Sequence, residues 1–223
     1  MNLTWLLILV SFLITFLASC YIKSNYRKYK TVNVSSRKTG YDVAREILDQ
    51  HNLSHILILE VAGELTDHYD PNKKVVKLSH DIYNGKSIAA VSVAAHECGH
   101  ALQDRDGYAF LKFRSTIAPL ASFSTKIGYI AIMIGFLFSL VDLIWLGIAF
   151  EMIILLFQLI TLPVEFNASS RALKIIEKGH IVNKDELSGA KTMLTSAALT
   201  YVAAVVSTVL ELLRLVLSAS RRR

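Results

Sequence analysis

The chain has 223 residues, of which 53% are hydrophobic, and its mean hydropathy of +0.43 exceeds what soluble globular domains usually show. Its net charge of +6 comes from basic residues that flank apolar blocks, which indicates contact with lipid headgroups; without an aromatic-plus-basic module, we expect no nucleic-acid partner. The two cysteines, Cys20 and Cys98, stand in very different settings and do not indicate a disulfide framework.

The first apolar block, residues 3–22, has about the 20 residues that a transmembrane helix needs. A cleaved signal peptide is disfavoured because no basic residue precedes the block. Residues 17–20 (Leu-Ala-Ser-Cys) resemble a lipoprotein processing site, and the missing basic start disfavours that alternative too. The basic residues follow the block instead: Lys23, Arg27, Lys28, Lys30, Arg37 and Lys38.

Residues 23–118 are predicted to form a catalytic region with a small sheet. Thr39 and Asp42 are spaced as a capping box, which predicts a helix start there. The β-rich run at residues 55–61 predicts a strand, and residues 73–79 predict a second strand whose lysines suit a sheet edge. A further helix is expected from Ser87 onward, giving the order helix, strand, strand, helix.

Residues 119–162 are predicted to form a transmembrane helical hairpin. The apolar block 127–162 is too long for one span and carries Asp142 near its middle, so we expect helices at 127–141 and 143–162 with a turn between them. The first arm is short, so it is expected to begin earlier, near Pro119.

Residues 163–193 are predicted to be a cytoplasmic helical segment, and residues 194–218 an apolar helix that either spans the bilayer or lies at its interface. Glu211 and Arg214 in that last helix are three residues apart and can pair. The apolar blocks predict an integral membrane protein, which we expect in a bacterial-type cell membrane. Charge counting predicts that residues 23–125, and the active site with them, face the cytoplasm.

The chemistry lies in residues 96–100, His-Glu-Cys-Gly-His. His96 and His100 are four residues apart, so on a helix they share one face and can both bind one zinc ion. Glu97 can then act as the general base of a metallopeptidase. Cys98 points away from such a metal and is interpreted as a packing residue, whereas Gly99 indicates close approach of another backbone.

A catalytic zinc needs a third protein ligand, for which Glu165, Glu177 and Glu186 are candidates. Pro163 suits the first turn of a new helix, so Glu165 is expected in that turn, where a carboxylate is also favoured by the helix dipole alone. The residues by themselves leave this choice open.

The chain resembles the YugP-type membrane zinc metallopeptidases (neutral zinc metallopeptidases) and, more distantly, the HtpX-type membrane proteases. The resemblance is carried by residues 63–71, 87–91, 95–103 and 162–169, and it covers nearly the whole chain. It implies a mainly α integral membrane protein with several transmembrane helices, a small α+β zincin-like catalytic domain, and Glu165 as third ligand. The HtpX-type group usually has Asp where this chain has Ser169, which departs from the pattern of a carboxylate behind a metal-bound histidine.

The implied function is a membrane-embedded endopeptidase with one Zn²⁺ per chain, acting on peptide or protein substrates that are membrane-associated, within the lipid bilayer. Zinc-activated water with Glu97 as general base would hydrolyse the peptide bond. His68 and Tyr201 are candidate contacts to substrate or transition state, and the predicted edge strand at residues 75–78 is a candidate for pairing with an extended substrate.

Two other classes of function remain open. One is a membrane protein that binds zinc without turnover, as a sensor or scaffold; the other is a partner-binding protein in which the motif is accidental. A third ligand that is Glu, with an open fourth position, favours the enzyme.

Overall fold

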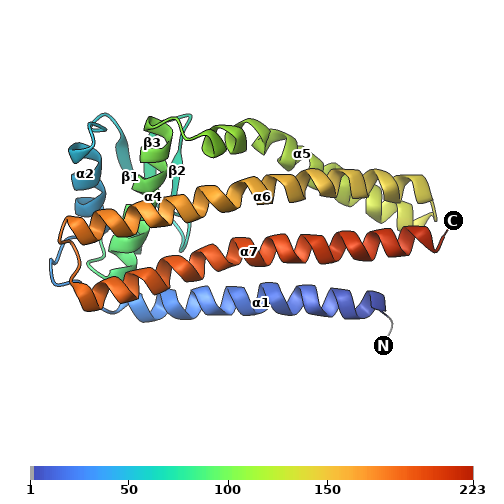
Figure 1. Ribbon diagram of the computed structural model, residues 1–223, viewed down its shortest axis with the longest axis horizontal. Coiled ribbons are helices and arrows are strands. Elements are labelled where there is room, and N and C mark those ends of the chain that lie inside the picture. Colours follow the sequence, from blue (N-terminus) through green and yellow to red (C-terminus); the bar gives the residue numbers. More distant parts are fainter. Residues whose placement is uncertain (1–2, 223) are drawn as a thin grey trace. The chain divides into compact units, whose positions relative to one another are not determined.

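A computed structural model describes residues 3–222 of the chain, and its contacts divide the chain into two compact units. The first, called here the apolar unit, comprises Met1–Ser19, Ala109–Pro163 and Leu199–Arg223. The second, the mixed unit, comprises Cys20–Tyr108 and Val164–Ala198. Three of the long helices drawn in Figure 1 contribute segments to both units.

The first short helix of the mixed unit, α2 (Gly40–Gln50), begins as the sequence predicts. The Thr39 hydroxyl accepts a hydrogen bond from the Asp42 N–H at 3.0 Å, and the Asp42 carboxylate accepts one from the Thr39 N–H at 2.9 Å. This capping box satisfies two backbone donors that the helix itself cannot. The apolar face of α2 is fully buried: Val43, Ala44, Ile47 and Leu48.

The sheet has three strands in the order β1-β3-β2: β1 (Leu57–Val61), β2 (His68–Asp70) and β3 (Val75–Ser79). β3 pairs in parallel with β1 and antiparallel with β2. The prediction that β3 is an edge strand is therefore wrong. Its core-facing side chains are buried, and the lysines that suggested an edge lie mostly before its first residue. β2 was missed because three polar or aromatic residues carry no alternating pattern.

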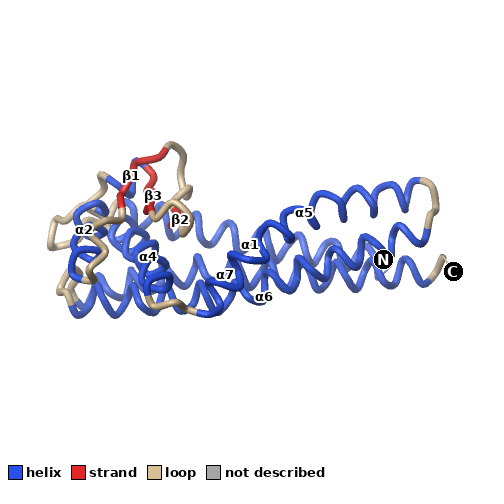
Figure 2. The backbone as a smooth tube through the Cα atoms, turned by 90° about the horizontal axis from the view of Figure 1, so that it is seen from above, coloured by secondary structure: helices blue, strands red, loops and turns tan. Residues whose placement is uncertain are grey.

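The helix that carries the histidines, α4 (Ile88–Arg105), follows the single-turn helix α3 (His80–Tyr83). It begins where the sequence predicts, and Ser87 caps it, with its hydroxyl 3.2 Å from the Ala90 N–H that donates to it. Most of α4 is buried among α2, the sheet and the parts of α6 and α7 in this unit (Figure 2). The helix that carries the two histidines is thus the centre of the core, which holds its side chains in fixed positions.

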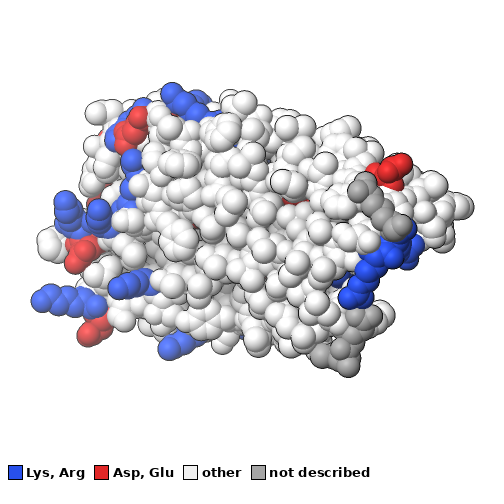
Figure 3. All heavy atoms as spheres, turned by 45° about the vertical axis from the view of Figure 1, so that its right-hand side comes forward, with Lys and Arg blue, Asp and Glu red and all other residues white. Residues whose placement is uncertain are grey.

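The apolar unit contains most of four helices, each long and apolar enough to cross a membrane: α1 (Leu3–Lys30), α5 (Ala109–Leu137), α6 (Val141–Lys178) and α7 (Lys184–Ser220). α7 contacts α1 through a hydrogen bond from Ser207 to the Ser11 carbonyl, and it contacts α6 through Leu215 packed with Ile144. A wide expanse without Lys, Arg, Asp or Glu covers much of the face drawn in Figure 3. Many large apolar side chains of these helices are exposed, as a lipid-facing surface requires.

The predicted hairpin is present as α5 and α6, with different boundaries. α5 begins at Ala109 and contains Pro119, and the turn lies at residues 138–140, so Asp142 occupies the first turn of α6. A carboxylate there is favoured by the positive end of the helix dipole.

Pro163 does not begin a new helix, which corrects a second prediction. It lies inside α6, which runs unbroken from Val141 to Lys178. Proline is tolerated within membrane helices because neighbouring groups satisfy the freed carbonyl. Glu165 is therefore not in a first helical turn, and a dipole effect does not account for its presence. The last helix begins at Lys184 and contains the expected pair, with Arg214 Nε 2.8 Å from Glu211 Oε2.

Candidate metal centre

Two imidazoles face one point from α4. His96 and His100 lie one helical turn apart, with ring centroids 4.8 Å apart and planes at 87°. Their side chains are 12% and 8% exposed. Both histidines are held within the core and do not lie on a solvated face. The motif is therefore not a chance match on a surface helix.

Glu165 reaches the same point from α6. Its Oε2 lies 3.3 Å from Nε2 of His96 and 3.6 Å from Nε2 of His100, and its side chain is 3% exposed. Among the described residues, these three form the group whose donor atoms all lie within 4.8 Å of one another. The structure thus brings together residues separated by 65 positions in the sequence (165 − 100).

Gly99 makes this approach possible. A Cβ at Gly99 would lie 2.7 Å from the carbonyl oxygen of Ala168 and 3.2 Å from its Cα. The backbones of α4 and α6 are therefore in direct contact one turn beyond Glu165, as the glycine in the motif predicts. This contact lets α6 come close enough to α4 for Glu165 to reach the histidines.

The donor set fits a zinc ion. Ligand atoms 2.0–2.1 Å from a tetrahedral zinc lie about 3.3–3.4 Å from one another, close to the two distances seen here. Two imidazole nitrogens and one carboxylate oxygen are the ligands of a catalytic zinc that keeps one position open. Cys98 is no fourth ligand: it is fully buried, and its sulfur lies 3.6 Å from the Ala44 carbonyl oxygen on the α2 side.

Ser169 stands behind His96. Its hydroxyl oxygen lies 3.1 Å from Nδ1 of His96. A neutral hydroxyl therefore occupies the place of the carboxylate that often orients a metal-bound histidine.

Glu97 is buried next to the histidines and next to β2. Burial raises the pKa of its carboxyl to about 7, while the charge of His96 and a hydrogen bond from the Tyr69 backbone N–H oppose the rise. The Tyr69 hydroxyl donates to Asp104 Oδ2 at 2.6 Å, so the same strand is also tied to the end of α4. Sequence reasoning missed Tyr69 because it missed the strand.

The remaining candidates have other surroundings. His68 is exposed on β2, with Nδ1 2.8 Å from the Thr66 carbonyl oxygen. Glu177 is exposed near the end of α6, and Glu186 accepts hydrogen bonds from the backbone N–H groups of Ser35 and Asn183. Tyr201 is half-buried in the part of α7 that belongs to the apolar unit. The roles of His68 and Tyr201 stay predictions.

Comparison with known proteins defines the class. A family model described as "Putative neutral zinc metallopeptidase" matches residues 4–220, nearly the whole chain. The chain belongs to this family of zinc metallopeptidases, as the resemblance in its motifs indicates.

The chain is also similar to one particular member of this class. The chain is 46% identical over 204 residues to the "Putative membrane protease YugP" of Bacillus subtilis (strain 168), covering 92% of this chain and 91% of the relative. The membrane character in that name agrees with the four candidate spans found here. No solved structure matches the chain.

Proposed function

We propose that this protein is a membrane-embedded, zinc-dependent endopeptidase that cuts membrane or membrane-proximal proteins. The observation that carries the proposal is the meeting of His96, His100 and Glu165, with Glu97 buried beside them. One zinc per chain, held by these three ligands, would act as a Lewis acid that polarises a scissile carbonyl and makes water more acidic.

Glu97 is the residue that would move the proton. It follows the first ligand on α4 and so can reach the water between the ligands and the substrate without binding the metal itself. As general base it accepts a proton from the attacking water and passes it to the leaving amine.

β2 is the strand that suits an extended substrate. In the described part of the chain it has β3 on one side and no strand on the other. The Tyr69 hydroxyl in its middle donates to Asp104 on α4, so a peptide paired with the outer edge of β2 would run close to the helix that carries the histidines. β2 therefore takes the place of β3 as the candidate strand for pairing with substrate, because β3 is enclosed between two strands. We keep the expectation, from charge counting, that the site faces the cytoplasm.

A non-catalytic zinc protein is the alternative. It would need a closed site, and the described donor group offers three ligands, with Cys98 directed elsewhere. The geometry therefore favours turnover.

The test is cleavage of an unfolded or membrane-bound test protein by purified wild type and by Glu97→Gln. We expect cleavage by the wild type that stops on zinc chelation and returns with added zinc, and none by Glu97→Gln. Equal cleavage by both proteins would contradict the proposal, whereas zinc binding by both without any cleavage would favour the alternative.

A further inference from the structure

Gln103 is the side chain behind His100. It lies on α4, three residues after that ligand, and is 0% exposed. A fully buried amide is costly unless its oxygen and nitrogen both find hydrogen-bond partners. The partners of Gln103 therefore reveal which neighbouring atoms donate and which accept.

The orientation of this amide is set by a carbonyl. The nitrogen of Gln103 lies 2.8 Å from the Val164 carbonyl oxygen, which can only accept a hydrogen bond. The amide oxygen must therefore face His100, where it lies 3.0 Å from Nδ1. An amide oxygen can only accept as well, so Nδ1 of His100 carries the proton. The other ring nitrogen, Nε2, then has its lone pair free and directed at the point shared with Glu165.

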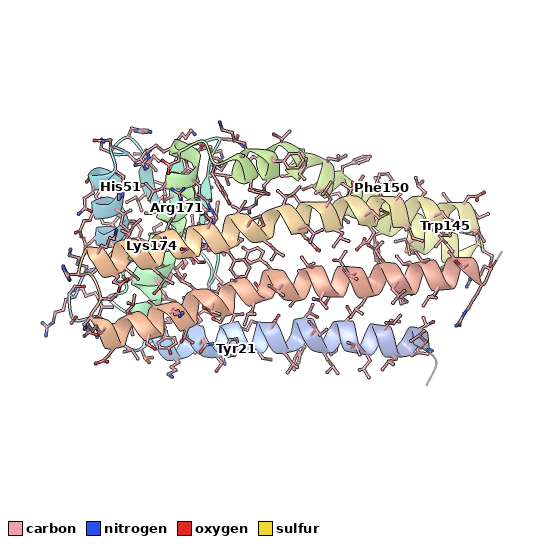
Figure 4. All side chains as sticks on the ribbon, viewed as in Figure 1. Tyr21, His51, Trp145, Phe150, Arg171 and Lys174 are labelled. Atoms are coloured by element: carbon pink, nitrogen blue, oxygen red, sulfur yellow. The ribbon has the colours of Figure 1, made fainter. Side chains whose placement is uncertain are left out.

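The same amide forms hydrogen bonds to α6 at residues before and after Glu165. Its nitrogen also donates to Asn167 Oδ1 at 3.0 Å, so its two partners on α6 are Val164 and Asn167. Asn167 Oδ1 is fixed as an acceptor because Nε of Arg171 donates to it at 2.8 Å. Arg171, labelled in Figure 4, in turn pairs with Asp106 just after the end of α4, at 2.5 Å. A continuous set of hydrogen bonds thus runs from His100 through α6 and back to the end of α4.

We infer that Gln103 is a positioning residue of the zinc site, which fixes the proton of His100 on Nδ1 and holds Glu165 at its distance from the histidines. The inference rests on the metal site of the proposed function, but not on which substrate is cut. One side chain sets both the tautomer of one ligand and the location of another, whereas the hydroxyl behind His96 can donate or accept and so fixes no tautomer.

The test compares Gln103→Met with Gln103→Glu. Methionine fills similar volume but offers His100 no comparable acceptor, whereas glutamate keeps the acceptor and loses the donor to Val164. Zinc affinity is measured by competition with a chromogenic chelator, and the visible spectrum after cobalt substitution reports the ligand geometry. Ser92→Ala is the matched control, since Ser92 is also buried on α4 and its hydroxyl has no partner.

The expected result is an order of affinities. Gln103→Met should lose about 10- to 100-fold in zinc affinity, the usual effect of removing a group that orients a metal-bound histidine. Gln103→Glu should bind zinc more tightly than Gln103→Met. Its melting temperature should nevertheless be lower than that of Gln103→Met, because its buried carboxylate faces two acceptor oxygens. Ser92→Ala should bind like the wild type, with an unchanged cobalt spectrum.

A purely structural role predicts the opposite order, because the variant with the worse packing would then bind zinc more weakly. That order, or zinc affinity of Gln103→Met within about threefold of the wild type, would overturn the inference. If the affinities follow the expected order while the wild type cleaves no protein, the inference stands and the proposed peptidase activity fails. A wild type that binds no zinc overturns both.

Discussion

Replacing Gly99 by alanine forces apart two helix backbones that touch beside the candidate zinc ligands. The new Cβ would lie 2.7 Å from the Ala168 carbonyl oxygen, whereas an ordinary contact begins at 3.4 Å, so the helices must separate by about 0.7 Å (3.4 − 2.7). The obstructing atoms belong to backbone and cannot rotate away. Metal–ligand distances tolerate about 0.2 Å of error, so the shift is too large for Glu165 and the histidines to keep one ion in place.

The expected loss of stability is smaller than the loss of metal binding. Overpacking of a core costs about 1–3 kcal/mol, but alanine in a helix is favoured over glycine by about 1 kcal/mol, so the net cost is about 0–2 kcal/mol. Gly99→Ala should therefore fold and yet bind zinc at least about tenfold more weakly, if the shift costs one hydrogen-bond-sized interaction of about 1.4 kcal/mol or more.

The assay is chelator competition for zinc, with the melting temperature measured on the same metal-free samples. Gly189→Ala is the matched control: it is also a helical glycine of the mixed unit, but a Cβ there meets the ends of two side chains, Tyr29 at 2.8 Å and Ile88 at 3.0 Å, which can move. Wild-type zinc affinity in Gly99→Ala would refute the reasoning that this backbone contact positions Glu165.

Three further predictions concern other contacts. Tyr69→Phe removes the hydrogen bond to Asp104 and should lower the free energy of unfolding by about 1–2 kcal/mol in denaturant titration; an unchanged value would show that the bond is not formed in solution. Arg214→Leu leaves Glu211 without its partner in an apolar helix and should lower the free energy of unfolding by about 2–3 kcal/mol. Changing both residues to leucine should recover most of this loss. A single variant that melts like the wild type would show that the pair contributes nothing. Zinc at 100 times its dissociation constant should stabilise the metal-free wild type by about 2.7 kcal/mol and raise its melting temperature, with no rise in Glu165→Ala; equal rises would remove Glu165 from the site.

Local patterns in the sequence predicted the parts of the fold that depend on nearby residues. The capping box at Thr39, the helix after Ser87 and the direction of Cys98 away from the histidines all follow from spacing along one helix, and each is present. The need for a close backbone at Gly99 was also visible, because glycine is a poor helix former. The particular backbone, at Ala168, was not, since nothing local reports which helix packs there.

Features that depend on distant packing were predicted less well. The lysines before β3 suggested an edge strand, but the burial of Val76 and Leu78 decides its place between two strands. Pro163 is compatible with a helix start, yet α6 continues through it, which membrane helices tolerate where neighbouring groups satisfy the freed carbonyl. Gln103 carries no signal of its own in a single sequence. Its role emerges only when α6 supplies Val164 and Asn167 as partners.

The central claim is that His96, His100 and Glu165 hold one zinc ion while Glu97 does not. Elemental analysis of the purified protein tests it most directly, in the wild type and in His96→Ala, Glu165→Ala and Glu97→Gln. The account predicts about one zinc per chain in the wild type and in Glu97→Gln, and loss of most of the metal in the other two. A full zinc complement in Glu165→Ala, or a wild type that carries none, would contradict it.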